Sequence, residues 1–182
     1  MPEGLVATLT EDELVDVVEY LMQLQTPSFT PDSWMVIGPF ASPGGNDGLD
    51  KTYGPERAFD LAAKIEGKSW TLVRPESGGY TDLAKLHGDK ANNTVSFAYK
   101  AIESPDAADA TVLLGTDDGA TLYVNGKEIF THKETRAASP EQNTVKVKLQ
   151  KGKNEILLKI ANGNNPHGFY FTIVGVPELK AK

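Results

Sequence analysis

The chain of 182 residues contains no cysteine. This absence excludes disulfides, thiolate metal sites, a cysteine nucleophile and covalent haem attachment through a CxxCH motif. No apolar run approaches the ~20 residues that a membrane-spanning helix needs. The histidines are far apart and show no HxH or HExxH spacing, so zinc is not indicated. There is also no GxSxG motif and no phosphate-binding glycine loop, and we therefore predict a protein that is not an enzyme.

Basic residues are absent from residues 1–27, which hold six acidic residues. The formal net charge is -7, so this segment carries -6 and the rest of the chain carries -1. An acidic balance argues against a nucleic-acid partner. The acidic start is also unlike the basic start of a secretory signal peptide. This step in composition predicts two units of different origin.

The first unit ends in a predicted helix over residues 10–24. Thr10 and Glu13 have the spacing of a capping box, and Pro27 follows where a helix should stop. Apolar residues recur at helical spacing and form one stripe: Leu14, Val17, Val18, Leu21 and Leu24. Because a lone helix of this length is marginal in water, the stripe needs a partner. That partner is the following domain, a neighbouring domain, or a second copy of the chain through helix-mediated self-association.

The stretch MPEGLVATLTEDELVDVVEYLMQL resembles the C-terminal end of the c-type cytochrome domains of large, planctomycete-type proteins. In that family the loop methionine is the axial haem ligand, a role that suits a thioether sulfur and would correspond to Met1. The CxxCH segment and the preceding helices of the family are absent from this sequence. The resemblance therefore implies haem only in an intact parent protein, and a periplasmic or extracellular location.

Residues 25–33 contain two prolines and small polar residues, which are typical of a linker. From Trp34 onward, apolar or alternating segments are separated by turn residues at regular spacing, as in an antiparallel sandwich. Strands are predicted at 34–40, 69–74, 94–104, 110–117, the two arms of 120–132, 144–149, 155–162 and 168–176. The Asn125-Gly126 pair favours a type I′ turn between the two arms. Eight or nine strands with short connections predict an all-β antiparallel sandwich, or jelly roll, preceded by one α-helix.

Other segments carry weaker expectations. Residues 41–57 are rich in glycine, proline, asparagine and aspartate and predict a long surface loop, a kind of segment that is often functional. Residues 55–63 favour one or two helical turns. Aromatic residues in the strands are predicted to belong to the core: Trp34, Trp70, Phe97, Tyr99, Tyr123, Phe169 and Phe171.

The ordered segments WMVIGPF, YGPERAFDL, EGKSW, VSFAYKAIES, LLGTDDGATLYVNGKEIF, LQKGKNEILLKIANG and GFYFTIVG resemble a galactose-binding-domain-like jelly roll. Similar modules accompany family-two glycoside hydrolases and many planctomycete enzymes. The Asp-Asp-Gly and Tyr-Val-Asn-Gly-Lys pattern also resembles the lectin modules related to anthrax protective antigen. The resemblance implies a non-catalytic module that binds a polysaccharide or another glycan.

Asp117 and Asp118 follow an apolar strand and precede Gly119. Adjacent carboxylates in a loop suit Ca²⁺, a cation that takes oxygen ligands. In the protective-antigen-type lectins such a pair holds a calcium ion that binds sugar hydroxyls. The alternative is a tight turn in which Asp118-Gly119 supplies the backbone geometry and an aspartate accepts hydrogen bonds from local N–H groups. Both interpretations stay open, so the pair are candidate calcium ligands and Ca²⁺ is a candidate cofactor.

Candidate ligand-binding residues lie in polar loops. Tyr53 and Tyr80 can each stack on a sugar face while the phenol forms hydrogen bonds. Asn164 and His167 belong to the polar segment 162–167, which could line a site. The alternative is that each is an ordinary loop residue. Convergence of these residues on one exposed surface favours sugar binding, and scatter favours a spacer.

We therefore divide the chain into a residual cytochrome-like loop and helix at 1–27, a linker at 28–33, the sandwich at 34–176 and a tail at 177–182. The leading hypothesis is a carbohydrate-binding module of a larger extracytoplasmic protein. The second is a structural spacer or protein-interaction domain.

The third hypothesis is a fragment related to a glycoside hydrolase. That chemistry needs two carboxylates that face one bond. Asp117 and Asp118, as neighbours near a strand, are expected to point apart.

Overall fold

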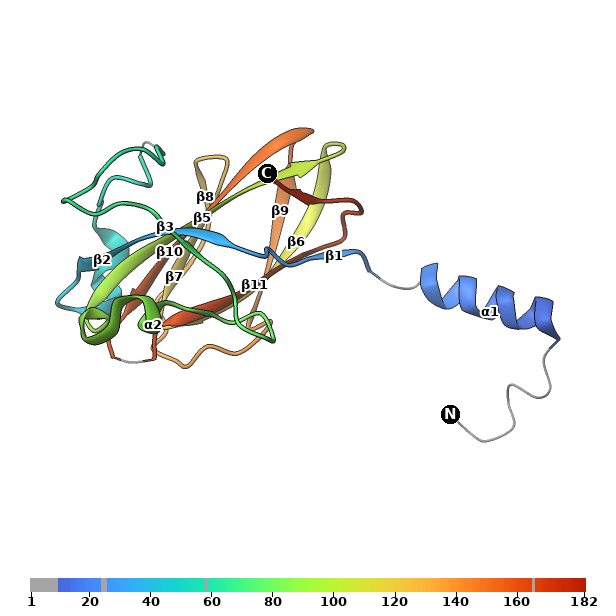
Figure 1. The fold of residues 1–182 in the computed structure, drawn as a ribbon, viewed down its shortest axis with the longest axis horizontal. Coiled ribbons are helices and arrows are strands. Elements are labelled where there is room, and N and C mark those ends of the chain that lie inside the picture. Colours follow the sequence, from blue (N-terminus) through green and yellow to red (C-terminus); the bar gives the residue numbers. More distant parts are fainter. Residues whose placement is uncertain (1–9, 24–25, 58, 165) are drawn as a thin grey trace.

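The computed structural model describes residues 10–23, 26–57, 59–164 and 166–182. Two antiparallel β-sheets pack face to face, and one helix stands apart from them on the N-terminal side (Figure 1). The predicted all-β sandwich with one N-terminal α-helix is confirmed. In the described ranges, no helix has the length and apolarity needed to cross a bilayer.

One sheet has five strands in the order β1-β11-β6-β9, with β4 also paired to β11. Its strands are β1 (Ser28–Phe29), β4 (Thr81–Asp82), β6 (Ala108–Asp117), β9 (Asn143–Leu149) and β11 (Gly168–Val174). The other sheet has seven strands in the order β3-β2-β5-β10-β7-β8, with β12 also paired to β5. Its strands are β2 (Trp34–Ala41), β3 (Thr71–Val73), β5 (Thr94–Ser104), β7 (Ala120–Val124), β8 (Lys127–His132), β10 (Gly152–Asn162) and β12 (Lys180–Ala181). The helical elements are α1 (Glu11–Gln23), α2 (Leu83–His87) and the 3-10 turns η2 (Gly45–Asp50) and η3 (Gly88–Lys90).

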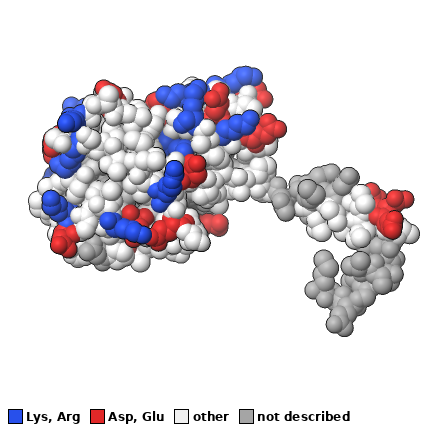
Figure 2. Space-filling view, viewed as in Figure 1, with Lys and Arg blue, Asp and Glu red and all other residues white. Residues whose placement is uncertain are grey.

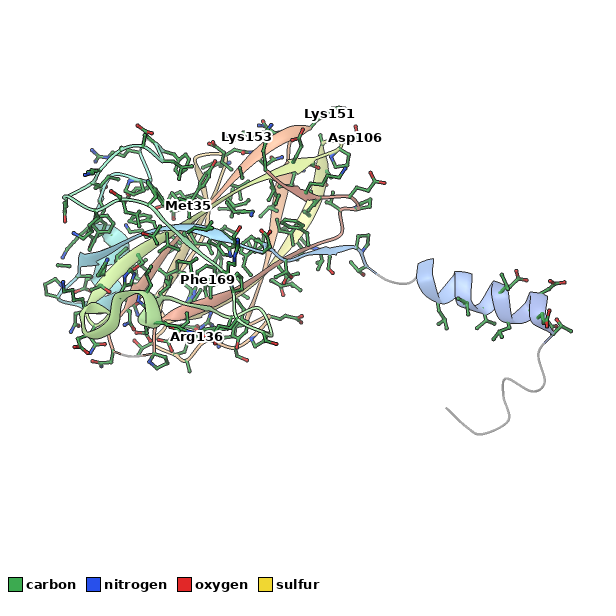
Figure 3. The ribbon with its side chains drawn as sticks, viewed as in Figure 1. Met35, Asp106, Arg136, Lys151, Lys153 and Phe169 are labelled. Carbon is green, nitrogen blue, oxygen red and sulfur yellow. The ribbon has the colours of Figure 1, made fainter. Side chains whose placement is uncertain are left out.

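The main core lies between the two sheets. Trp34 of β2 is 1% exposed and meets Phe169 and Phe171 of β11 edge-on, with ring centroids 5.2 and 5.1 Å apart. Figure 3 labels Phe169 inside the sandwich. Edge-to-face packing of this kind adds to the stabilisation from burial alone. These strand aromatics are therefore core residues, as the sequence predicted.

A second apolar layer covers the outer face of the seven-stranded sheet. Val95, Phe97 and Tyr99 of β5 point outward there, whereas Ala98 and Ile102 point into the main core. Residues 42–70, which we call the covering segment, fold over the outer face and contribute Leu49 and Trp70 to this layer. The alternation in β5 predicted one apolar side correctly, but the opposite side is buried as well.

The covering segment is fixed by Lys159 of β10, whose side chain is 1% exposed. Its ammonium group donates hydrogen bonds to the Leu49 carbonyl at 3.1 Å, to the Lys51 carbonyl, and to the Glu56 carboxylate at 3.2 Å. Burial lowers the pKa of this ammonium group, and the Glu56 carboxylate opposes that shift. A buried charge is tolerated because it is paired and hydrogen-bonded.

Two expectations for this region are wrong. Residues 41–57 are not simply a surface loop, because they form η2 and bury Ser42 and Leu49. Within the described part of 55–63 there is no helix; two separate turns are closed, where the Arg57 N–H donates to the Gly54 carbonyl and the Ala63 N–H donates to the Asp60 carbonyl. The apolar residues of this segment cover a sheet instead of forming one face of a helix.

The predicted strands agree closely with the observed ones, and short pairings extend the sandwich at both ends. β1 lies in the predicted linker and pairs with β11, while β12 lies in the predicted tail and pairs with β5. The sequence analysis also missed β4 and α2. Two-residue strands carry no periodicity, and their partners are remote in sequence, so only the fold defines them.

The β7–β8 hairpin is confirmed, with positive φ values of 52° at Asn125 and 76° at Gly126. Asn125 also accepts a hydrogen bond from the Glu155 N–H, which joins the turn to β10. Strand β9 buries Val145 and Val147 and exposes its lysines, as its alternation predicted. The turn and the alternation are both local signals, which explains why they were readable in the sequence.

Helix α1 begins with the predicted capping box. The Glu13 carboxylate accepts a hydrogen bond from the Thr10 N–H at 2.9 Å, and the Thr10 hydroxyl accepts one from the Glu13 N–H at 3.3 Å. Its apolar stripe is exposed to between 37% and 49%: Leu14, Val17, Val18 and Leu21. The expected packing of this stripe on the sandwich is therefore not observed, while Leu24 and Met1 lie outside the described residues.

The surface charges differ between the two parts. Acidic residues gather at one end of α1, whereas Lys and Arg alternate with Asp and Glu over the visible face of the sandwich (Figure 2).

Self-association of two copies of the chain through the exposed apolar stripe of α1 stays a prediction.

Replacing Lys159 by Met should destabilise the sandwich. The change leaves the Glu56 carboxylate and two carbonyls without their buried donor, and we expect the free energy of unfolding to fall by about 3 kcal/mol. Urea unfolding followed by tryptophan fluorescence measures this. The control is Lys148→Met, because the Lys148 side chain is 87% exposed and its ion pair with Asp109 should contribute little to stability. Equal losses in the two variants would show that Lys159 is not the anchor.

Candidate functional site

A polar cleft of about 500 Å³ lies at the end of β6. We call it the loop cleft. Three loops meet there: the start of η2 with the residue before it, the β8–β9 loop and the β10–β11 loop. Asn93, just before β5, borders the cleft as well. Its lining residues are Gly44, Gly45, Asn46, Asn93, Asp117, Asp118, Thr135, Arg136, Ala137, Gly163, Asn164 and Pro166.

Asp118 ties two of these loops together. It is 6% exposed, and its two carboxylate oxygens accept hydrogen bonds from the Arg136 N–H and the Gly163 N–H, both at 2.9 Å. Its own N–H donates to the Ala161 carbonyl at 3.0 Å. Hydrogen bonds that involve a charged group are stronger than neutral ones. One carboxylate therefore fixes the loops on two sides of the cleft.

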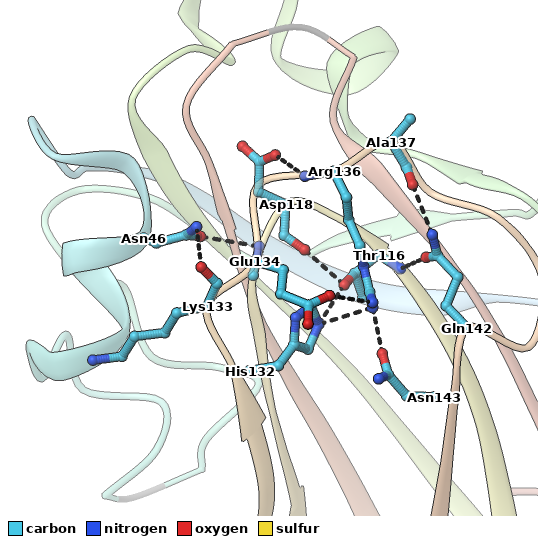
Figure 4. A network of polar contacts seen from close by, with 11 residues as sticks. Asn46, Thr116, Asp118, His132, Lys133, Glu134, Arg136, Ala137, Gln142 and Asn143 are labelled. Carbon is cyan, nitrogen blue, oxygen red and sulfur yellow. Dashed lines mark hydrogen bonds and ion pairs between the residues drawn. The ribbon is translucent and has the colours of Figure 1, made fainter.

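The third loop is fixed by Asn46. Its amide oxygen accepts from the Gly119 N–H, and its amide nitrogen donates to the Lys133 carbonyl, both at 3.0 Å (Figure 4). A Cβ atom on Gly119 would lie 2.5 Å from this amide oxygen. A residue larger than glycine at 119 would therefore displace Asn46.

The side chain of Arg136 points toward the strands, where it joins a hydrogen-bond network (Figure 4). Its guanidinium group donates to Glu134 at 2.9 Å and to Asn143, and it lies 3.2 Å from His132 Nε2. Burial, together with the Arg136 charge, lowers the pKa of His132 to about 4. At neutral pH this imidazole is uncharged and can accept the Arg136 hydrogen bond. The network fixes the β8–β9 loop and leaves the guanidinium group largely engaged.

Asp117 is 3% exposed and lines the same cleft as Asp118. The peptide bond between the two residues is cis. Burial and the neighbouring Asp118 charge raise the pKa of Asp117 to about 6, while the Ala138 backbone N–H acts in the opposite direction. Both residues border one cleft, and the expected divergence of their side chains stays a prediction.

The donor set matches a calcium ion only in part. Within the described ranges, no group of three or more His, Asp or Glu side chains is placed to hold a metal ion. Both oxygens of Asp118 already accept backbone N–H groups, which is the role that the alternative interpretation gave to an aspartate here. Ca²⁺ prefers six to eight oxygen ligands. Calcium binding stays a prediction.

The predicted ligand-binding residues do not all meet. Asn164 lines the loop cleft and is exposed. Tyr53 instead packs on Phe40 of the outer layer, and its phenol donates to the Ala41 carbonyl at 3.2 Å. Tyr80 packs against Tyr170, with ring centroids 5.1 Å apart. Neither tyrosine lines the loop cleft.

His167 is fully buried, so the expectation that it lines an accessible site is wrong. Its carbonyl accepts from the N–H groups of Leu83 and Ala84 and thereby joins the β10–β11 loop to α2. Its ring lies 6.0 Å from that of His87. Burial and the His87 ring lower the pKa of His167 to about 3, and the Ile160 backbone acts in the opposite direction. Neither ring nitrogen of His167 makes a hydrogen bond of ordinary geometry within the described residues.

Several cleft residues were missed by sequence reasoning. Asn46 lies in the 41–57 segment, whose composition did indicate a functional loop. Thr135 and Arg136 lie in the β8–β9 connection, where no motif pointed to a site. Their role depends on the Asp118 contact, which is made across the fold and leaves no local pattern.

These features define an antiparallel β-sandwich of two sheets with a polar cleft at its loops. No protein-family model matches the sequence, and no curated protein sequence matches it. The fold is similar to part of the β-glucuronidase of Ruminococcus gnavus in complex with uronic isofagomine, with a TM-score of 0.51 and 14% identity. The match covers 85% of this chain and 29% of that chain, so the present chain spans less than a third of the enzyme's length. Identity this low shows a shared fold alone.

A family 35 carbohydrate-binding module from an environmental isolate is also similar, with 18% identity over 60% of this chain and 85% of that chain. Its TM-score is 0.42, a value at which two folds need not be the same.

Replacing Asp118 by Asn should loosen the loop cleft. The amide can accept through only one oxygen, so either Arg136 or Gly163 loses a charge-assisted acceptor. We expect the free energy of unfolding to fall by about 2 kcal/mol and the amide hydrogens of residues 136 and 163 to exchange faster. Hydrogen exchange followed by NMR measures the second effect. Unchanged protection at both amides would contradict the proposed tie.

Replacing Asp117 by Asn should stabilise the protein at neutral pH in the presence of a chelator. The folded-state pKa of about 6 exceeds the ordinary 3.8, so the folded state favours protonated Asp117. The contribution of Asp117 to stability is then present below about pH 4 and is lost as the pH rises through 6. Because water in the cleft screens the charge, we expect the variant to gain only about 1 kcal/mol at pH 7 and nothing below about pH 4.

Thermal unfolding across this pH range tests the prediction. The control is Asp109→Asn, because the ion pair with Lys148 lowers the pKa of Asp109 and the sign is opposite. Added Ca²⁺ provides a second comparison, since an ion bound by Asp117 would stabilise the wild type and not D117N. A variant no more stable than the wild type at pH 7 in chelator would contradict the expected sign.

Proposed function

We propose that this chain is a non-catalytic β-sandwich module that binds carbohydrate in the loop cleft. The observation that carries the proposal is the cleft itself. Its volume of about 500 Å³ lies within the usual range for small-ligand sites. Its lining combines amide, hydroxyl and carboxylate groups, supplied by Asn46, Asn93, Thr135, Asn164 and Asp117.

This chemistry suits sugar hydroxyl groups, which donate and accept hydrogen bonds at once. An amide such as Asn164 can do both, and the Asp117 carboxylate can accept from two neighbouring hydroxyls. Asn164 lines the cleft and is exposed, so a ligand in the cleft could reach its amide.

The loops around the cleft are held before any ligand arrives. Asp118 and Asn46 fix three of them, and the Asn93 N–H donates to the Gly163 carbonyl at 2.9 Å. A preorganised site loses less conformational entropy on binding. This support favours recognition of a ligand by the loops over a purely passive spacer.

A glycosidase function is less well supported. Hydrolysis of a glycosidic bond normally requires two carboxyl groups with separate roles. Of the described residues that line the cleft, only Asp117 and Asp118 carry a carboxylate, and both oxygens of Asp118 bind backbone N–H groups. We therefore propose binding without catalysis, in line with the polar lining.

The wider setting is part of the same proposal. The fold occurs within a β-glucuronidase, which supports a place beside proteins that act on sugars. A larger extracytoplasmic parent protein, with haem bound by an upstream cytochrome domain, rests on the resemblance of residues 1–24. A CxxCH motif in the upstream coding sequence would support it, and an upstream region without such a motif would count against it.

A spacer or protein-interaction domain is the second candidate, and one observation favours it. Tyr53 and Tyr80 are not brought to the loop cleft, so the cleft has no tyrosine platform among its described lining residues. A sugar in the cleft would depend on hydrogen bonds and, where present, a bound cation. Such a site should bind weakly.

Glycan-array screening followed by calorimetric titration, with Ca²⁺ and with a chelator, tests the proposed function. We expect a polysaccharide or oligosaccharide to bind, and Asn164→Ala to weaken binding about tenfold because one amide partner is lost. Asp109→Asn is the control, since Asp109 lies outside the cleft and is exposed near the start of β6. Failure to bind any glycan in either condition would favour the spacer.

A further inference from the structure

A second concave site lies on the outer face of the seven-stranded sheet. We call it the sheet groove. Its volume is about 210 Å³, and it shares no lining residue with the loop cleft. The groove is bordered by part of the covering segment on one side and by the β7–β8 turn on the other. Its lining residues are Pro55, Glu56, Arg57, Phe59, Tyr99, Tyr123, Asn125, Gly126, Glu155 and Leu157.

The strand register builds the floor of this groove. Tyr99 of β5 is paired with Leu157 of β10, and Leu157 is paired with Tyr123 of β7. Residues paired in this way point to the same face of a sheet. Glu155 lies two residues before Leu157 on β10 and therefore on that face too. The floor is thus an apolar row with a tyrosine at each end and a carboxylate beside it.

The covering segment closes one end of the row and leaves the other open. Phe59 stacks on Tyr99, with ring centroids 3.5 Å apart and ring planes 17° apart, and Tyr99 is 5% exposed. Tyr123 is partly exposed and forms no aromatic pair with another described residue. Its phenol makes no hydrogen bond within the described part of the chain. The ring packs against the outer apolar layer and borders the groove, so its groove side is the surface that a ligand would contact.

The polar rim of the groove is nearly balanced in charge. The Glu155 side chain is 37% exposed, and one of its oxygens accepts from the Tyr99 phenol at 3.2 Å and from Lys153 at 2.7 Å. The other oxygen has no partner within the described residues. Glu56 is likewise paired, with Lys159. The lining also includes the exposed guanidinium group of Arg57. With both carboxylates paired to lysines and this one further cation, the groove is close to neutral, so it favours a neutral ligand over an ionic one.

We propose that the sheet groove is a second carbohydrate subsite, which takes one neutral pyranose ring stacked on Tyr123 with a hydroxyl donating to Glu155. Aromatic stacking provides the apolar contact, and the carboxylate fixes the orientation of the ring. The volume lies below the range typical of drug-sized ligands, so the groove suits a single ring or the end of a chain. The inference rests on the proposed carbohydrate-binding function, but it concerns a different face of the molecule.

Two-dimensional ¹H–¹⁵N NMR of the full chain, titrated with methyl β-D-glucopyranoside, tests this subsite. The amides of residues 123, 126 and 155 report on the sheet groove, and those of residues 46, 163 and 164 report on the loop cleft. We expect saturable shifts in the groove amides. Tyr123→Leu should weaken this binding roughly tenfold, whereas Tyr123→Phe, which keeps the ring, should stay within about twofold of the wild type.

Tyr170→Leu is the matched control, because Tyr170 is a partly exposed tyrosine on β11 of the other sheet. Its spectrum should keep the groove shifts, and the dispersed spectra of all variants report whether they fold. Sodium glucuronate is the anionic counterpart of the probe and should bind the groove more weakly.

The outcomes separate the two proposals. Shifts at the cleft amides alone, unaffected by Tyr123→Leu, would overturn the subsite and leave the proposed function standing. Shifts at the groove amides alone would support the subsite and reject the loop cleft as the sugar site. Shifts at neither set would overturn the subsite, whereas the proposed function is decided by the glycan array. Glucuronate binding as tight as that of the glucoside would overturn the assignment to a neutral sugar.

Discussion

The loop cleft depends on one buried carboxylate, that of Asp118. It accepts hydrogen bonds from two backbone N–H groups that lie 18 and 45 residues away along the chain. The two loops would otherwise end in unpaired polar groups at the edge of the sandwich, and buried polar groups without partners are costly. This tie holds the backbone at Arg136 and at Gly163, next to Asn164, on two sides of the cleft.

A second buried charge has the same role on another face. The Lys159 ammonium group binds two carbonyls and a carboxylate of the covering segment, so a polar stretch of chain packs on an apolar sheet. In both places a charge within the fold bonds to the backbone of a loop instead of to a ligand. This arrangement gives the sandwich two concave sites, and each is bordered by a segment that a buried charge anchors.

The prediction of the strands from sequence was accurate because the information is local. Alternation in β9, the Asn-Gly turn at residues 125–126 and the apolar run of β6 each depend on neighbouring residues. The capping box of α1 is local as well, and it was predicted to the residue. Errors occurred where the partner is remote, as for β1, β4 and β12. The 41–57 segment shows the same limit, because its burial depends on a lysine on β10.

The candidate site was predictable only in part. Asp117, Asp118 and Asn164 were identified from their loops, and all three line the cleft. His167 was expected to line an accessible site, yet it is buried. The composition of a polar loop does not reveal that one of its side chains turns inward. Tyr53 and Tyr80 were chosen as exposed rings, yet both pack against other aromatic side chains. Tyr123 was assigned to the core, and it is partly buried against the outer apolar layer while it also borders the sheet groove.

The amino-acid sequence by itself therefore determined the antiparallel strands, the β7–β8 hairpin, the capped helix and the separation of an acidic N-terminal unit from a nearly neutral sandwich. Those features depend on periodicity, turn chemistry and charge, which act over a few residues. The tertiary structure alone decided which loops meet at the cleft. It also decided that the Asp118 carboxylate binds backbone N–H groups while Asp117 lines the same cleft, and where the outer face of the seven-stranded sheet remains uncovered. These outcomes depend on contacts between distant residues, and such contacts leave no local pattern in the chain.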